Sequence, residues 1–402
     1  MTVPLAIRHS PALGVPAVTV VHPNGCGAQA LWKALATNTT GLARNGLEWC
    51  DLPCWIGTVP GADAGLPDDL KQWDSRAHRL VWLALQDASF RSAIDGAIGR
   101  YGAHRVGLFI GTSTSGIRST EVAYGVRRSS GQWPPAFSYR HTHSADSLCR
   151  FAAEILHLRG PVAAITTACS SSAKVFLAAQ RFIRAGLIDA AVVGGADSLC
   201  LSTLHGFASL QLLSEDICRP FDVDRKGISI GEAAGFALLD KAPSKINLVS
   251  GGESSDAWHM STPHPEGVGA RQAMVQAITA AGLTPAEIGY VNAHGTGTPA
   301  NDGSEAAALR DVFGPLGVPV SSTKGLTGHT LGAAGIVEAI VTMLALEHQT
   351  LPGSPTLVSP DSTLGLDTVL QPRTERIRFA MSNSFGFGGS NCSLVFGMDG
   401  VQ

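Results

Sequence analysis

Short apolar runs alternate with longer amphipathic stretches along the whole chain. An apolar run of about four to six residues suits a buried strand and is too short for a helix. Such runs predict strands at 17–21, 106–111, 162–165, 190–194 and 236–239. Apolar residues that recur three or four positions apart predict helices at 28–36, 75–88, 147–156 and 173–185.

The second half of the chain repeats this order of elements from about residue 246. The pattern predicts a helix at 270–281, strands at 290–294 and 318–322, a turn and helix from 323, and strands at 377–383 and 393–396. The unit that begins at 318 resembles the one that begins at 162: a strand, a small polar turn and a helix of small residues. Alternating strands and helices predict α/β layers with mostly parallel sheets. We therefore expect a duplicated core, with halves at 1–245 and 246–402.

Two regions are not assigned to a strand or helix. Residues 41–72 are interrupted by Pro and Gly and carry scattered Trp, so we expect a surface excursion there. A polar stretch after residue 116 carries Arg118, Arg127 and Arg128.

Composition and charge exclude several classes of protein. The chain has 402 residues, 45% of them hydrophobic, which is enough for one large core or two moderate ones. Its 29 Lys and Arg against 32 Asp and Glu give a net charge of −3, so no bulk electrostatic case for nucleic acid or membrane binding follows. There is no signal-peptide pattern and no apolar run of about 18 residues, since Glu338 interrupts 336–346. We expect a cytoplasmic protein.

Cysteine spacing gives no metal site. Among eight cysteines, Cys50 and Cys54 come nearest to a ligand pair, and no matching pair accompanies them. Free thiols in a reducing compartment are the expected state.

Cys169 lies where the predicted strand 162–165 turns into the predicted helix 173–185. Unsatisfied backbone N–H groups and the positive end of the helix dipole meet at such a turn, where they lower a thiol pKa and can hold an oxyanion. Ser170, Ser171 and Ser172 are potential helix caps. The alternative is a small buried cysteine without a chemical role.

Two histidines occur in turns rich in Gly and Thr. His294 ends a predicted strand and is followed by Gly295, Thr296, Gly297 and Thr298, whose hydroxyls can line a channel. His329 begins a helix of small residues, and a helix N-terminus disfavours imidazolium. This imidazole is therefore expected to be neutral and to donate a hydrogen bond to developing negative charge. A structural role is the usual fate of a lone histidine.

Two glycine motifs are decoys. Gly227-Ile-Ser229-Ile-Gly231 fits the esterase pattern G-x-S-x-G, but that pattern needs a strand before it and a helix after it. Here a polar segment precedes the motif and a strand pattern follows it. The run Gly386-Phe-Gly388-Gly389 lies between two predicted strands, which excludes a dinucleotide fingerprint.

Four motifs together resemble the β-ketoacyl-acyl carrier protein synthases, the elongating condensing enzymes of the thiolase superfamily. They are T-A-C-S-S-S-A around Cys169, H-G-T-G-T at 294–298, S-T-K-G-L-T-G-H-T-L-G-A-A-G at 322–335 and S-N-S-F-G-F-G-G-S-N at 382–391. The motifs follow the family order over nearly the whole chain. His22-Pro-Asn-Gly25 departs from the usual Thr-Gly-x-Gly turn, and Ile228 replaces a frequent Phe. The resemblance implies a duplicated thiolase-like fold layered αβαβα.

The resemblance also implies a decarboxylative Claisen condensation. Cys169 would accept an acyl group from a carrier-protein thioester. Malonyl-carrier protein would then lose CO2, with His294 and His329 donating hydrogen bonds to the enolate oxygen. The backbone N–H groups of Cys169 and Phe387 would hold the other oxyanion. No cofactor is required, because the substrates travel on the phosphopantetheine arm of the carrier protein.

Further roles follow from the same resemblance. Lys324 would support the second histidine, with Glu305 as its ionic partner. Substrate would contact Thr296, Thr298 and Phe385. A monovalent cation would lie among four further residues: Asn292, Glu338, Ser382 and Asn383.

The implied partners are the acyl carrier protein and a second subunit. Carrier proteins are acidic, so docking needs a local basic patch, for which the candidates are Arg76, Arg79, Arg127 and Arg128. The second subunit would be another copy or a chain-length-factor-like chain, with Thr114 lining the partner's acyl pocket. The segment 212–222 is similar to synthases of aryl polyene clusters, and the acyl chain itself remains open.

Three other classes remain as alternatives. A thiolase would need a second catalytic cysteine near the C-terminus, where Cys392 lies beyond the glycine loop. An initiating synthase would carry Cys-His-Asn instead of Cys-His-His. A non-catalytic chain-length factor would lack the nucleophile, and Cys169 with both histidines speaks against it.

Overall fold

The computed structural model describes residues 11–314 and 317–399. The extreme N-terminus, on which part of the signal-peptide prediction rests, lies outside these residues. The first half of the chain forms a mixed sheet in the order β1–β9–β7–β5–β6. β1–β9 and β9–β7 are antiparallel pairs, and β7–β5 and β5–β6 are parallel pairs. The strands are β1 (Leu13–His22), β5 (Val106–Gly111), β6 (Val162–Ile165), β7 (Ala190–Asp197) and β9 (Ala233–Asp240).

The second half repeats this order of pairings. From β10 outward the order is β10–β17–β16–β11–β12–β14, with two antiparallel pairs followed by three parallel ones. The duplicated core predicted from the sequence is therefore confirmed. The sheets meet where β1 pairs with β10. The strands are β10 (Ile246–Ser255), β11 (Ile288–Asn292), β12 (Pro319–Ser321), β14 (Asp367–Thr368), β16 (Phe379–Gly386) and β17 (Ser390–Met398).

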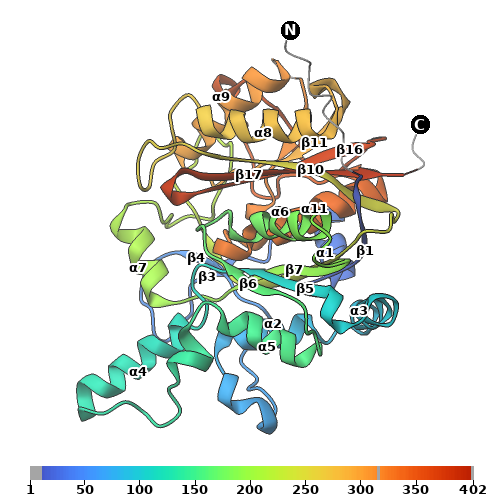
Figure 1. The fold of residues 1–402 in the computed structure, drawn as a ribbon. Helices are drawn as coiled ribbons and strands as arrows, with labels where there is room; N and C mark the ends of the chain where they lie inside the picture. The colour runs from blue at the N-terminus through green and yellow to red at the C-terminus, as the bar shows by residue number, and fades with distance from the viewer. Residues whose placement is uncertain (1–10, 315–316, 400–402) are drawn as a thin grey trace.

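Helices complete five layers in the order αβαβα, as predicted (Figure 1). One outer layer holds α2 (Arg76–Ala84), α3 (Ala88–Tyr101) and α5 (Ser147–Ile155). The central layer holds α6 (Ser171–Arg184) and α11 (Ala334–His348) between the two sheets. The other outer layer holds α8 (Val268–Ala281) and α9 (Pro299–Phe313).

The central helix α11 is apolar on all sides and buried from Ala334 to Leu346, which is typical of a helix inside a core. The window Leu331–His348 is long and apolar enough to cross a membrane, but 89% of it is buried inside the fold. Gly335 lets α11 approach α6 closely, because a Cβ there would lie 2.4 Å from the backbone nitrogen of Ala173.

Several elements differ from the sequence prediction. The helix predicted at 75–88 ends early, because α2 stops at Ala84. Asp87 then caps a further helix, α3, by accepting from the N–H groups of Ser89 and Phe90, and the sequence pattern did not predict that helix. The polar stretch after residue 116 is a helix, α4 (Ile117–Ser130), in which only Thr120 and Ala123 are buried. A helix with so little buried surface carries no apolar stripe for the sequence pattern to detect.

Residues 41–72 are more than a surface excursion. Cys50, Cys54 and Ile56 pack with Leu204 and Ile228 in a small apolar cluster. Remaining elements are α1 (Ala28–Ala36), β2 (Gly25–Cys26), β3 (Ala43–Arg44), β4 (Trp55–Gly57), α7 (Leu201–Ser209), β8 (Ile230–Gly231), α10 (Lys324–Thr327), β13 (Thr350–Leu351) and β15 (Arg373–Thr374).

The esterase-like motif has the wrong surroundings, as predicted. Ser229 is followed by β8 and β9 and not by a helix. Its buried hydroxyl accepts a hydrogen bond from the N–H of Cys218 at 3.0 Å, which is a structural contact.

Candidate active site

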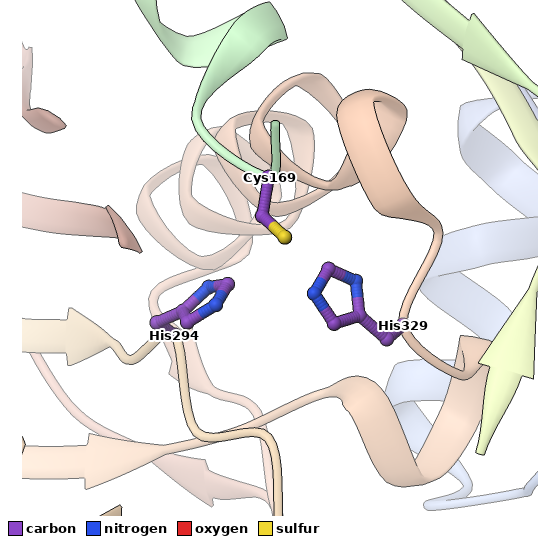
Figure 2. A group of neighbouring side chains, drawn as sticks. All are labelled: Cys169, His294 and His329. Carbon is purple, nitrogen blue, oxygen red and sulfur yellow. The ribbon is translucent and has the colours of Figure 1, made fainter. Parts of the chain in front are cut away.

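Three chain segments bring Cys169, His294 and His329 together at the bottom of a cavity of about 130 Å³. One thiol or imidazole atom from each lies within 4.8 Å of the others. The imidazole rings are perpendicular, with centroids 5.3 Å apart, and the sulfur of Cys169 points between them (Figure 2). Each of the three residues is at most 5% exposed. The thiol and both imidazoles therefore surround one small, desolvated space.

The backbone immediately before the nucleophile position is strained. Ala168 has a φ of +50°, a left-handed conformation that an L residue other than Gly rarely adopts. Serine capping is absent: Ser170 makes no cap with its side chain. Instead Ser171 bridges Ala168 and Thr167, and Ser172 Oγ accepts from the N–H of Ile336 on α11 at 2.9 Å. These serines hold the turn and fasten it to the other half of the molecule.

The thiol pKa is not lowered, contrary to the sequence prediction. Burial raises the pKa of Cys169 to about 11, although Lys324 and the N–H of Phe387 act in the opposite direction. Desolvation outweighs these two effects on the thiol pKa because the sulfur is enclosed. In this state Cys169 is a thiol, and the N–H of Phe387 is already placed at the reacting atom.

His329 is a neutral hydrogen-bond donor, as the sequence predicted. Burial and the nearby Lys324 ammonium hold its pKa well below the ordinary value. The N–H of Leu331 donates to Nδ1 at 3.1 Å. Because Nδ1 accepts, the proton of the neutral ring lies on Nε2. The helix α11 begins five residues later than His329, at Ala334, so burial and not the helix dipole is the main cause.

His294 reaches the same protonation state by another contact. Its pKa is also well below the ordinary value, through burial and then the charge of Lys324. The ammonium of Lys324 lies 3.3 Å from Nδ1 and donates to the carbonyl oxygen of His294. Lys324 thus contacts His294 directly, and the predicted support of His329 is limited to the charge that lowers the pKa of that ring.

The predicted ion pair is also corrected. Lys324 pairs with Glu338 and not with Glu305. Glu305 instead accepts from the backbone N–H groups of His294 at 2.9 Å and Gly295 at 2.7 Å, so it shapes the loop that carries the histidine. Burial raises the pKa of both carboxyl groups to about 7.

The wall of the cavity contains the residues predicted to contact substrate. Thr296 and Thr298 line it with hydroxyls 3.0 Å apart, and Thr298 also caps α9 by accepting from the N–H of Asn301. Phe385 and Phe387 also line the cavity. Sequence reasoning missed an apolar stretch of this wall, because its members lie in segments without a motif: Phe207, Leu210 and Leu212.

A thiol with two imidazoles could in principle chelate a soft metal. Here both Nδ1 atoms accept hydrogen bonds from Lys324 and Leu331, so the protons occupy the Nε2 atoms that would have to ligate. The arrangement suits hydrogen-bond donation to a substrate better than metal binding.

Other predicted residues lie elsewhere. Thr114 is outside the cavity but buried, and its hydroxyl donates to Asp197 at 2.8 Å, so it is not a free turn residue. Cys392 is buried in β17 and outside the cavity lining, which leaves it unsuited to a thiolase reaction.

The four arginines proposed for docking differ in availability. Arg76 pairs with Glu232 and Asp63, and Arg79 pairs with Asp74. Arg127 and Arg128 are exposed in the last turn of α4 and form no ion pair within the part of the chain that the structure describes.

Two protein-family models match the chain. The beta-ketoacyl synthase N-terminal domain matches residues 69–244, and the beta-ketoacyl synthase C-terminal domain matches residues 247–357. The chain is 34% identical to 3-oxoacyl-[acyl-carrier-protein] synthase 2 of Vibrio cholerae, over 94% of this chain and 96% of that protein.

Solved structures agree with these matches. A chain in the complex of a ketosynthase with its chain length factor from Xenorhabdus doucetiae is 38% identical, with a TM-score of 0.85 over 96% of this chain and 98% of that one. A beta-ketoacyl synthase from Burkholderia phymatum is 26% identical, with a TM-score of 0.86 over 97% of this chain and 100% of that one.

Proposed function

The chain belongs to the β-ketoacyl synthase family, and on that premise we propose that it is a β-ketoacyl-acyl carrier protein synthase. This acyltransferase condenses an acyl group held on Cys169 with a malonyl group carried on an acyl carrier protein. The reaction needs no cofactor beyond the phosphopantetheine arm of the carrier. One observation carries the proposal: two neutral imidazoles, His294 and His329, present Nε2–H donors beside a thiol in a desolvated cavity.

In the first half-reaction the sulfur of Cys169 attacks the carbonyl carbon of an acyl thioester. The backbone N–H groups of Cys169 and Phe387 hold the resulting oxyanion. The carbon–sulfur bond to the carrier then breaks, and the carrier thiol leaves with the proton that Cys169 gave up. An acyl-Cys169 thioester remains.

In the second half-reaction malonyl-carrier protein occupies the cavity. Its thioester oxygen accepts from Nε2–H of His294 and of His329, and the bond to the carboxylate breaks to release CO2. The electron pair of that bond forms the enolate, whose carbon attacks the acyl carbonyl. Cys169 leaves as a thiolate, and the product is a β-ketoacyl thioester on the carrier. Two fixed donors stabilise the enolate because they need no reorganisation as charge develops.

The test is to incubate the protein with an acyl-carrier protein and locate the acyl group by mass spectrometry. We expect the label on Cys169 of the wild type and of Cys392→Ala, and no label on Cys169→Ala. Cys392 is the matched control, since it is another buried free thiol. An unlabelled wild type would favour the alternative function, a non-catalytic chain-length-factor subunit.

We also propose that the protein works with a second thiolase-fold subunit, either another copy or a chain-length-factor-like chain. Within the described residues β6 pairs only with β5, and Val162 on its open side is 41% exposed. Helix α4 also exposes Val122 and Tyr124 by half or more. The Xenorhabdus complex supports the heterodimeric form. Thr114 would then approach the partner's acyl pocket.

A structural cation fits three of the four residues predicted to hold it. Asn292 Oδ1, Glu338 Oε2 and Ser382 Oγ are buried oxygens without a hydrogen-bond partner among the described residues. Asn292 and Ser382 are aligned on neighbouring strands. Hard cations prefer such oxygen ligands. Asn383 departs from the set, since its side chain bonds Glu305 and Ser393. These three oxygens would hold the ion.

Two further proposals concern the domain boundaries and the cellular location. The halves 1–245 and 246–402 would be the two thiolase-like units, which the repeated order of strand pairings on either side of β10 supports. The enzyme would work in the cytoplasm, where its eight free cysteines would remain reduced.

A further inference from the structure

Asp197 is a buried carboxylate at the end of β7 that no cation neutralises among the described residues. It is 0% exposed and appears in no ion pair of that part of the chain. Its oxygens instead accept from a ring of neutral donors. These are the hydroxyls of Thr112, Ser113 and Thr114 and the N–H groups of Ser113, Thr114 and Gly332. A buried charge is tolerated only when its lone pairs are satisfied in this way.

One of these donors leads directly to the reacting centre. The N–H of Gly332 lies 2.6 Å from Asp197 Oδ2. The preceding residue, Leu331, has a φ of +54° and donates its N–H to Nδ1 of His329. A left-handed Leu is strained, so the surroundings must hold it in this conformation. Asp197 anchors the C-terminal side of this turn, and the packed Leu331 side chain anchors its middle.

We propose that Asp197 is a positioning residue for His329: through Gly332 it holds the Leu331 turn, which keeps Nδ1 occupied and the proton on Nε2. The proposal rests on the proposed function, in which that Nε2–H stabilises the malonyl enolate. The same carboxylate fixes the loop Thr112–Thr114, so both segments share one anchor.

A carboxylate is suited to this task and an amide is not. All six contacts of Asp197 are made by donors, and a carboxylate offers acceptors only. In Asp197→Asn the NH2 group would face at least one of these donors, most directly Gly332 or Ser113. The turn would then loosen, and His329 would sample the other tautomer.

The test separates the two half-reactions. In Asp197→Asn we expect acyl transfer to Cys169 to persist. We expect the rate of malonyl decarboxylation to fall, but by less than the about 10²–10³-fold that complete removal of one oxyanion donor costs. Nitrogen-15 NMR of labelled His329 should show Nε2 protonated in the wild type and a mixture of tautomers in the variant. A purely structural residue would lower both half-reactions together and leave the tautomer unchanged.

Asp240→Asn is the matched control. Asp240 is also a buried carboxylate. In the pair β7–β9, Asp197 lies opposite Ala233 at one end and Asp240 lies opposite Ala190 at the other. Its partners are Arg100 and Tyr101, far from the site along the strands. This variant should lose stability without changing the ratio of the half-reactions.

A second variant keeps the proposal testable if Asp197→Asn does not fold. A Cβ in Gly332→Ala would lie 2.6 Å from Asp197 Oδ2 and 2.7 Å from the nitrogen of Ser113, so it pushes the turn away from its anchor. The same loss of decarboxylation is expected. A wild-type ratio of half-reactions and a wild-type tautomer in the folded variant would overturn the proposal. A wild type that never decarboxylates malonyl-carrier protein would instead overturn the proposed function.

Discussion

His294 and His329 present the same chemical group to the cavity, yet the protein holds them by different means. His294 depends on a charged side chain, since the Lys324 ammonium lies against both Nδ1 and the carbonyl oxygen. His329 depends on the backbone, through the N–H of Leu331. In both cases burial lowers the imidazole pKa and an occupied Nδ1 leaves the proton on Nε2.

The difference matters for how each donor can fail. The support of His294 includes a buried ion pair, Lys324 with Glu338, and removing one member leaves an uncompensated charge. The support of His329 is the backbone N–H of Leu331, which only a proline would remove and which other substitutions can only displace. The support of His294 is therefore strong, but a single substitution can abolish it. The support of His329 has weaker individual contacts, which are distributed over a whole turn.

The largest expected effect comes from breaking the charged support. Lys324→Met should lower the free energy of unfolding by about 3–5 kcal/mol, because Glu338 remains buried and unpaired. Denaturant unfolding measures this loss. The double variant Lys324→Met with Glu338→Met should recover most of the stability, since apolar groups replace both charges. In that double variant His294 should change tautomer while His329 does not. A change at His329 alone would show that the supports are assigned to the wrong histidines.

Removing the two imidazole donors should have the next largest effect. The loss of decarboxylation should be equal for His294 and His329. His294→Ala and His329→Ala should each retain acylation of Cys169 and lose about 10²–10³-fold in malonyl decarboxylation. CO2 release and acyl-enzyme formation, measured separately, give both numbers. Decarboxylation at the wild-type rate in either variant would remove that histidine from the enolate site.

The smallest effect is expected from a change that leaves both supports intact. Reversing Arg127 and Arg128 to Glu should raise the apparent KM for carrier-bound substrate, because these exposed arginines are proposed to meet an acidic partner. A small malonyl thioester should react as before, with both histidines unaffected. The matched change is Arg376→Glu, on an exposed arginine outside α4 that forms no ion pair among the described residues. Equal effects on carrier-bound and small substrates would count against docking at α4.

The sequence predicted what depends on local pattern. Strand, turn and helix were visible around Cys169 and His329, and the similarity of the two units predicted a duplicated core. The sequence also predicted a helix of small residues after His329, and the structure places Gly335 of that helix against Ala173. The three reacting groups therefore converge as predicted.

What the sequence could not supply depends on which buried group faces which. Glu305 on α9 and Glu338 on α11 are both buried carboxylates near Lys324, and spacing along the chain does not decide between them. The thiol pKa was mispredicted for the same reason, since the enclosure of Cys169 arises from distant segments. Asp197 was visible as an acidic residue after an apolar strand, but its partners come from two remote loops.

The absent side chain of Gly335 has a consequence for how such enzymes can diversify. It sets the separation of α6 and α11, and Cys169 and His329 precede those two helices in the chain. Any larger residue there would push the nucleophile and one donor apart by moving the whole core. The apolar part of the cavity wall formed by Phe207, Leu210 and Leu212 carries no reacting group. Selection can therefore change which substrates the enzyme accepts by altering these three residues, while the core keeps the distance between the nucleophile and the donor fixed.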